Sequence, residues 1–190
     1  MKNNQRPFIY SIILIFGVLA VISCDDVLPK PKAMLRLEYS KPVYEAFQPN
    51  DCPYAFDRNI HAKVIDEKYC SVNLKYPELD GTIYLSYRNV DGDLKELLSD
   101  VQKMTYEHVV KADNILEQPY DNAKARKFGM FYEVTGNAAS QSQFYLTDSV
   151  SHFITGSIYF NTRPNYDSIL PAAVYLKDDV RRIMESLEWR

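Results

Sequence analysis

The sequence has 190 residues, which suits a single domain, and its content of 46% hydrophobic and 13% aromatic residues is sufficient for a buried core. This composition excludes general disorder. The net charge of −3 includes Lys2 and Arg6, and no basic run occurs anywhere, so there is no electrostatic reason to expect a nucleic-acid partner.

The N-terminal segment predicts export. Lys2 and Arg6 precede a run of 15 uncharged residues, Phe8–Ile22. This run is shorter than the roughly 20 residues that a helix needs to cross a bilayer. A small residue and then Cys24 follow, and this ending resembles a bacterial lipoprotein signal. The resemblance implies that residues 1–23 are removed and that Cys24 is acylated. The alternative is an uncleaved membrane anchor in which the cysteine is incidental.

The segment after the anchor predicts a spacer. Pro29 and Pro31 alternate with lysines, and prolines favour an extended geometry of about 3 Å per residue. We therefore interpret residues 24–33 as the acylated cysteine and a Pro/Lys stalk that holds the domain off the membrane. Residues 34–190 are then expected to form a single globular domain.

Two further cysteines, Cys52 and Cys70, are expected to pair. An oxidising compartment outside the cytoplasm favours disulfides, and closing this loop would stabilise the fold by roughly 3 kcal/mol. Two alternatives stay open at this point: two reduced buried cysteines, or one reactive thiol.

Three strands are predicted in the first half of the chain. Apolar and polar residues alternate over residues 34–39, 70–76 and 82–90, as in strands that are buried on one face. Between Tyr39 and Val64 several prolines interrupt the pattern. We expect that region, which includes Cys52, to be mostly loop.

The first helix is predicted over residues 93–111. Its apolar residues recur at steps of three and four, and Asp93 with Glu96 three residues later predicts a capping box. His108 falls on or beside the apolar stripe, where a histidine is usually a packed residue with a hydrogen-bond partner rather than a ligand.

The second half of the chain predicts a meander followed by a helix. A short strand over residues 114–120 is expected to end at Pro119, and three longer strands are predicted over residues 127–135, 140–148 and 151–162. Their links are short enough for hairpins, so they should pair in antiparallel fashion.

The C-terminal helix is predicted to begin near Asp167 or Ser168 and to continue for about 20 residues, with Pro171 tolerated because it falls in the first turn. Its buried stripe is expected to comprise Ala173, Leu176, Val180, Ile183, Met184 and Leu187. Together these elements predict an α+β fold: one domain with a mostly antiparallel sheet that is covered by two main amphipathic helices.

Motifs for catalysis or metal binding do not occur. The six glycines form no nucleophile elbow, phosphate loop or dinucleotide fingerprint, and His61, His108 and His152 are too scattered for a zinc site. Asp178 and Asp179 are expected on the solvated face of the last helix, beside arginines. We therefore predict neither a metal nor a cofactor, and no enzymatic activity.

One polar stretch is a candidate binding surface. Residues 135–148 gather amide and hydroxyl side chains in a turn and a strand, and such groups can line a pocket or dock another chain without charge. The candidates are Asn137, Ser140, Gln141 and Gln143. The alternative is an ordinary hydrated hairpin face.

Several long segments carry a specific resemblance. Together with the leader they are "PKPKAMLRLEY", "MTYEHVVKADNILEQPY", "GMFYEVTGNAASQSQFYLTDS", "HFITGSIYFNTRPNYDSILPAA" and "DVRRIMESLEW". From about Pro29 to Trp189 the chain resembles the gliding-motility lipoprotein GldD of the Bacteroidota. The order of strands and helices is also similar to that of the PsbP and Mog1 type of α/β/α sandwich.

The resemblance implies a cell-envelope lipoprotein that is needed for gliding and linked to the type IX secretion machinery. The expected partners are the membrane, through the N-terminal lipid, and other envelope proteins, with the folded domain facing the periplasm. Two other functions stay open: a periplasmic lipoprotein that binds a small ligand, and a thiol enzyme that uses Cys52 or Cys70 with a histidine. Apart from Cys24, the resemblance assigns no functional residue.

Overall fold

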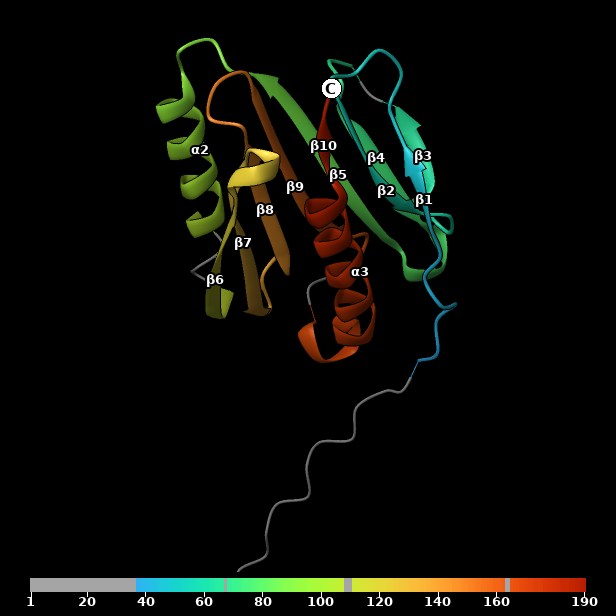
Figure 1. Ribbon diagram of the computed structural model, residues 1–190. Helices are drawn as coiled ribbons and strands as arrows, with labels where there is room; N and C mark the ends of the chain where they lie inside the picture. The colour runs from blue at the N-terminus through green and yellow to red at the C-terminus, as the bar shows by residue number, and fades with distance from the viewer. Residues whose placement is uncertain (1–36, 67, 108–110, 163–164) are drawn as a thin grey trace, which may run out of the picture. The chain divides into compact units, whose positions relative to one another are not determined.

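The main sheet has seven strands in the computed structural model, which describes residues 37–66, 68–107, 111–162 and 165–190 (Figure 1). The predicted signal peptide, Cys24 and the stalk lie outside the described residues. All neighbouring strands in this sheet are antiparallel. Across the sheet their order is β3 (Lys63–Asp66), β4 (Val72–Tyr76), β5 (Gly81–Asn89), β9 (His152–Phe160), β8 (Ser142–Thr147), β7 (Lys127–Gly136) and β6 (Ala112–Asn122).

The predicted meander is confirmed, because β7, β8 and β9 are sequential antiparallel neighbours. The ring of Phe144 on β8 lies directly over Gly156 on β9. A Cβ at position 156 would be only 2.0 Å from the Phe144 Cε1 atom, so this close approach requires glycine.

A second, three-stranded sheet has the order β1 (Tyr44–Phe47), β2 (Tyr54–Asn59) and β10 (Glu188–Trp189). The prediction that the region between Tyr39 and Val64 is mostly loop holds for Cys52 and its neighbours, but it misses β1, β2 and the start of β3. These strands are short, and β2 pairs with a strand from the far end of the chain. The predicted strand over residues 34–39 is not observed in its described part, residues 37–39.

The two long helices, α2 (Leu94–Tyr106) and α3 (Tyr166–Ser186), pack on opposite faces of the main sheet (Figure 1). From α2, Thr105 Oγ1 donates a hydrogen bond to Gln143 Oε1 at 3.1 Å, and from α3, Arg181 Nη2 donates to Gln118 Oε1 at 2.7 Å. The strand register places Gln143 opposite Tyr132, whereas Gln118 is opposite the adjacent residue, Phe131, so the two glutamines point to opposite faces. The α+β class is confirmed.

The main core lies between α3 and the sheet. Its fully buried aliphatic side chains come from both: Val72, Leu74, Ile83, Leu85, Leu146, Ile154 and Ile158 from the strands and Leu176, Val180 and Ile183 from the helix. Every residue of the stripe predicted for the C-terminal helix is buried, so that prediction is confirmed. Two short 3₁₀ helices, η1 (Pro77–Leu79) and η3 (Ala123–Ala125), complete the described elements.

Helix α2 differs from its prediction in two respects. The α-helix ends at Tyr106 rather than at residue 111, and His108 lies outside the described residues. The Asp93 side chain caps no helical amide; it accepts instead from the backbone N–H of Asp91 at 3.0 Å. Most of the predicted stripe is only half-buried, and Met104 is 58% exposed.

Two prolines lie deeper in their elements than predicted. Pro119 does not end its strand; it is inside β6, opposite Met130, and is accommodated because β6 is an edge strand. Pro171 is in the second turn of α3, because the helix begins at Tyr166, earlier than expected. There it costs one intrahelical hydrogen bond.

Candidate functional site

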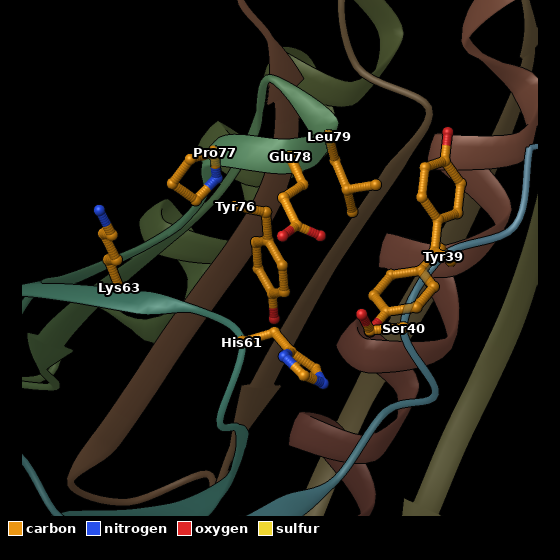
Figure 2. A pocket seen from close by; sticks show the side chains of 9 residues that line it. Tyr39, Ser40, His61, Lys63, Tyr76, Pro77, Glu78 and Leu79 are labelled. Atoms are coloured by element: carbon orange, nitrogen blue, oxygen red, sulfur yellow. The ribbon is translucent and has the colours of Figure 1, made fainter.

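A cavity of about 250 Å³ lies beside the β4–β5 turn (Figure 2). Its walls come from the segment before β1, the β2–β3 turn, η1 and α3. The lining residues are Tyr39, Ser40, His61, Lys63, Tyr76, Pro77, Glu78, Leu79 and Tyr175. We call this space the aromatic cavity.

Local sequence explains how η1 presents its side chains to the cavity. Pro77 is at the start of the 3₁₀ turn, where a fixed φ is favourable and a missing N–H costs nothing. Asp80 ends the turn in the left-handed region, and its backbone N–H donates to Pro77 O. The turn therefore holds Glu78 beside the ring of Tyr76, as Figure 2 shows.

Three tyrosine rings form the apolar part of the cavity. The Tyr39 and Tyr175 ring centroids are 5.6 Å apart at an interplanar angle of 72°, and those of Tyr76 and Tyr175 are 6.4 Å apart at 75°. Both pairs have the edge-to-face geometry that aromatic quadrupoles favour. Tyr39 and Tyr175 are half-buried and Tyr76 is buried, so the first two are accessible walls and the third closes the base.

Beneath the cavity lies the carboxylate of Asp179, which is 1% exposed. Its Oδ1 accepts a hydrogen bond from Tyr44 Oη at 2.6 Å, and its Oδ2 accepts from Tyr76 Oη at 2.7 Å and from Asn59 Nδ2 at 2.9 Å. Asn59 Nδ2 also donates to Tyr175 Oη at 2.9 Å. The cavity wall is thus connected to the buried carboxylate through Tyr76 and Tyr175.

The prediction that Asp178 and Asp179 both lie on a solvated face is half wrong. Asp178 is exposed, but Asp179 points inward toward β1, β2 and β4. The partners that make this burial possible are 103 to 135 residues away in the chain, so the local charge pattern gave no sign of them.

Burial raises the pKa of Asp179 above its ordinary value, and the exposed Asp178 adds to this, whereas the three hydrogen bonds act in the opposite direction. Burial is also the first cause of the raised pKa values of Tyr76 and Tyr44, and Asp179 raises both further. Each of the three groups that donate to Asp179 is electrically neutral. The negative charge therefore has hydrogen-bond partners without a direct counter-cation among them.

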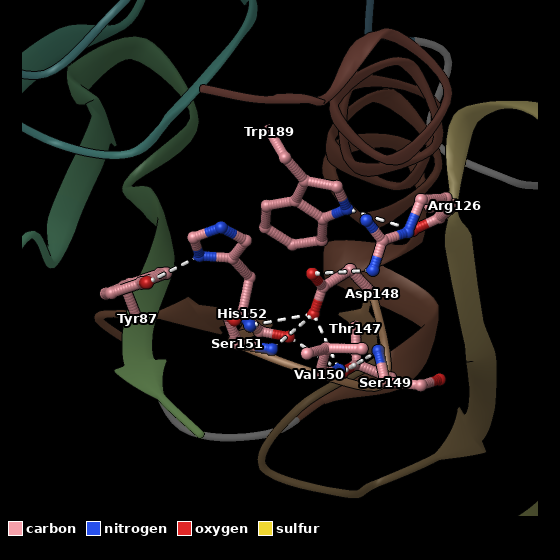
Figure 3. A network of polar contacts seen from close by, with 9 residues as sticks. All are labelled: Tyr87, Arg126, Thr147, Asp148, Ser149, Val150, Ser151, His152 and Trp189. Carbon is pink, nitrogen blue, oxygen red and sulfur yellow. Dashed lines mark hydrogen bonds and ion pairs between the residues drawn. The ribbon is translucent and has the colours of Figure 1, made fainter. Parts of the chain in front are cut away.

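A second hollow of about 430 Å³ lies where the chain's last residues meet the β8–β9 link. Figure 3 shows that its groups are engaged with one another. The Trp189 ring stacks on His152 at 5.2 Å, and Trp189 Nε1 donates to Arg126 O at 3.0 Å. His152 Nδ1 and Tyr87 Oη are 2.7 Å apart. This arrangement attaches β10 to the main sheet, and we call it the Trp189 clasp.

Asp148 organises the loop under the clasp. Its Oδ1 accepts from the backbone N–H groups of Val150, Ser151 and His152 at 2.8–3.0 Å, and its Oδ2 is 3.6 Å from Arg126 Nη2. Burial alone would raise the pKa of Asp148, but these backbone donors outweigh it and lower the pKa below its ordinary value.

Cys52 and Cys70 are joined by a disulfide, with Cα atoms 5.5 Å apart. Of the three alternatives the sequence left open, the structure has the bonded pair. Tyr54 Oη donates to Cys70 O at 2.7 Å and so fixes the second half of the bridge. With both sulfurs bonded, neither is a nucleophile, which leaves the thiol-enzyme alternative without its reactive group.

The candidate binding surface on the β7–β8 hairpin is not an exposed surface. Ser140, Gln141 and Gln143 are all buried. Ser140 Oγ donates to Ser142 O, Gln141 Nε2 donates to Ala138 O, and Gln143 Oε1 accepts from Thr105 Oγ1, while Gln141 Oε1 has no hydrogen-bond partner among the described residues. Asn137 is exposed, but its Oδ1 accepts from the backbone N–H of Tyr166 at 2.9 Å and so supports the start of α3. The polar sequence serves hairpin and helix contacts.

Within the described ranges, no group of histidine, cysteine and acidic side chains is placed to hold a metal ion. None of the helices in that part of the chain is both long and apolar enough to span a bilayer.

Comparisons with known proteins complete the description. The search of curated proteins gave no match. Among solved structures, the chain is similar to the solution structure of cyanobacterial PsbP (CyanoP) from Synechocystis sp. PCC 6803, with 10% sequence identity, a TM-score of 0.48, and coverage of 88% of this chain and 99% of that one. The family model described as gliding motility lipoprotein GldD matches residues 24–189, which is most of the sequence. This chain therefore belongs to the family of the gliding motility lipoprotein GldD.

Proposed function

We propose that this protein is a lipid-anchored accessory or assembly factor of the cell envelope, linked to type IX secretion, that supports gliding motility through contacts with other proteins. The observation that carries the proposal is the family match over residues 24–189, which includes the cysteine expected to bear the lipid. In this proposal the lipid and the stalk set the position and reach of the domain. The folded domain offers a fixed surface facing the periplasm.

Acylation of Cys24 is tested by growing expressing cells with an alkyne-labelled fatty acid and isolating the protein. The wild type should be labelled and should sediment with membranes, whereas Cys24→Ala should be unlabelled. A variant with both Cys52→Ser and Cys70→Ser is the matched control, because it retains only Cys24 and should still be labelled. An unlabelled wild type in the soluble fraction would refute the anchor.

The cellular role is tested by complementation. In a gliding bacterium that lacks its own family member, the wild-type gene should restore both spreading on agar and secretion of a type IX cargo protein, while Cys24→Ala should restore neither fully. Restored spreading without restored secretion would refute the link to type IX secretion. Protease added to intact cells and to spheroplasts should cleave the domain only in spheroplasts if it faces the periplasm.

A second candidate function, binding of a small ligand, is favoured by the aromatic cavity of about 250 Å³. Concave sites with mostly apolar lining and a few polar groups are typical of ligand pockets. Native mass spectrometry of the protein extracted gently from its own membranes should then detect a bound small molecule. A mass equal to that of the acylated protein alone, with no added small molecule, would favour the protein-contact role.

A further inference from the structure

The aromatic cavity has the composition of a site for an organic cation. Tyr39 and Tyr175 present accessible rings at an edge-to-face angle, and Tyr76 closes the base. Ring faces carry negative electrostatic potential, so a cation that enters between such rings is attracted to more than one of them. A neutral apolar group would gain only the area that it buries.

Two carboxylates add negative charge at the two ends of the cavity. Glu78 lies at the mouth, where its side chain is exposed and close enough to Tyr175 to influence that phenol. Asp179 lies beneath the base and has only neutral hydrogen-bond donors. A cation in the cavity would therefore lie between the solvent-exposed carboxylate of Glu78 and the buried carboxylate of Asp179.

The bond from Tyr76 to Asp179 strengthens this preference. When a phenol donates a hydrogen bond to a carboxylate, electron density shifts toward the ring, and the ring attracts cations more strongly. The Tyr76 ring is therefore more electron-rich than an ordinary tyrosine ring, at the position that a bound cation would approach.

Lys63 also lines the cavity, but its own ammonium group does not occupy the space between the rings and Glu78. On β3 its side chain is on the face of the sheet opposite to that of Val64, which packs against the core. Figure 2 accordingly shows the Lys63 side chain extending away from Tyr76 and Glu78. His61 Nε2 is directed elsewhere, 3.2 Å from Lys41 O.

The surroundings of the cavity indicate that the cation belongs to a protein. Leu37 and Ile60 are close in sequence to the lining residues Tyr39 and His61, and Val43 O accepts the backbone N–H of Ile60 at 2.9 Å. All three are aliphatic side chains with exposed fractions of 44%, 46% and 51% for Leu37, Ile60 and Val43. Exposed aliphatic groups beside a pocket for one anchoring side chain are typical of a protein interface.

We propose that the aromatic cavity binds the lysine or arginine side chain of a partner protein, with Tyr39 and Tyr175 as the walls and Glu78 at the mouth. This inference rests on the proposed function, because it assigns a surface to the protein contacts assumed there. The aliphatic residues Leu37, Val43 and Ile60 then contact the partner around the inserted side chain.

Binding is measured on the full lipidated chain in detergent, by the shifts of tyrosine ring signals in nuclear magnetic resonance spectra. The probes are acetylated, amidated Gly-Lys-Gly and Gly-Arg-Gly, with Gly-norleucine-Gly as the uncharged isostere of the lysine peptide. We expect both basic peptides to bind about tenfold more tightly than the norleucine peptide, as several cation–π contacts would provide. Equal binding of the norleucine peptide would overturn the proposal.

Matched variants locate the site. Glu78→Gln should weaken the binding of the basic peptides about three- to tenfold, whereas Glu96→Gln, which removes an exposed acid on α2, should have no effect. Tyr39→Leu should reduce the preference for the cation and Tyr39→Phe should retain it, because phenylalanine keeps the ring. Weaker binding by Glu96→Gln would contradict the assignment, and so would unchanged binding by Glu78→Gln.

The source of the cation is tested with choline and in cells. Tighter binding of choline than of the lysine peptide would show that the ligand is a free small cation and would overturn the partner assignment. A photo-crosslinking residue at Ser40, which lines the cavity, should capture a partner beside one of its lysines or arginines. Replacing that partner residue by glutamine should reduce the product, as Glu78→Gln should and Glu96→Gln should not. Neither fatty-acid labelling nor complementation by the wild-type gene measures what the cavity binds, so their success together with failed peptide binding would refute this inference alone.

Discussion

The carboxyl group of Asp179 makes the stability of this domain depend on pH. Its pKa in the folded protein is raised, chiefly by burial, so the folded state holds the proton more tightly than the unfolded state. The stabilisation that comes from this tighter proton binding by Asp179 is complete below the unfolded pKa of about 4. It is lost as the pH rises through the folded pKa. Asp148 affects stability in the opposite direction. Because its folded pKa is lowered, its contribution is present above the unfolded pKa and is lost as the pH falls through the folded pKa.

We predict that the wild type loses stability relative to Asp179→Asn as the pH rises from about 4 toward neutrality, because asparagine has no proton to lose. The measurement is the free energy of unfolding from urea titrations of both proteins at several pH values. Asp100→Asn, at an exposed position on α2 that is not among the groups shifting the pKa of Asp179, is the control and should follow the wild type closely. A difference that grows in favour of the wild type toward neutral pH would mean that Asp179 has a lowered pKa.

Gly156 is packed so closely against the Phe144 ring that no larger residue fits without a change. Its replacement by alanine places a methyl group against the Phe144 ring, and overpacking of this kind costs roughly 1–3 kcal/mol. Combining Gly156→Ala with Phe144→Leu should recover part of the loss caused by the alanine, because the ring no longer occupies that space. Thermal unfolding of the two single variants and the double variant checks this. Additive losses would show that Phe144 is not the obstacle.

Residues that act through distant partners could not be found from the sequence. Asp179 follows Asp178 and precedes two arginines, which is the pattern of a solvated helix face, and nothing nearby in the chain identifies Tyr44, Asn59 or Tyr76 as its partners. The same applies to the aromatic cavity as a whole. Fifteen tyrosines suggest interfaces only weakly, and only the fold selects the three that form it.

At the scale of elements, long periodic segments were predictable and short strands were not. Helix α3 and the β7–β9 meander repeat their apolar pattern several times, and the structure confirms them. Strands β1, β2 and β3 have only four to six residues, and prolines between them suppress the alternation. Strand β10 has two residues and exists through its pairing with β2. Such strands are specified by their partners rather than by local pattern.

The Trp189 clasp allows a test of how β10 is held. Trp189→Ala removes the indole ring, and with it the stack on His152, the hydrogen bond to Arg126 O and the packing next to β2. We therefore expect a loss of about 2–3 kcal/mol of folding free energy. Tyr69→Ala is the control, because that ring is 84% exposed and its loss should change stability by less than about 0.5 kcal/mol. Equal effects of the two substitutions in urea unfolding would show that the clasp contributes nothing.

At the scale of the whole molecule, the disulfide constrains the unfolded chain more than the folded one. The bridge closes a loop with a sequence separation of 18, so replacing both Cys52 and Cys70 by serine should cost about 3 kcal/mol. Unfolding of the wild type with and without reductant provides an independent measure and should give a similar loss. If reduction leaves the unfolding midpoint unchanged, the bridge does not contribute to stability.

Family membership was also predictable at this scale, because the resemblance spans most of the sequence and does not depend on one short motif. The burial of most of the candidate hairpin residues could not be predicted, for a physical reason. Amide side chains such as Gln141 and Gln143 satisfy hydrogen bonds equally well inside a protein and at an interface, so their presence in the sequence did not distinguish the two.

Pro119 has a consequence for how copies of this protein behave when they are crowded together. Strand β6 is an outer edge of the main sheet and is 11 residues long, which is enough to serve as a template for a strand from a neighbouring copy. A proline supplies no N–H, so a strand added along that edge would meet a gap in the ladder. Where molecules are concentrated on one surface, Pro119 therefore makes this edge a poorer template for a strand from a neighbouring copy.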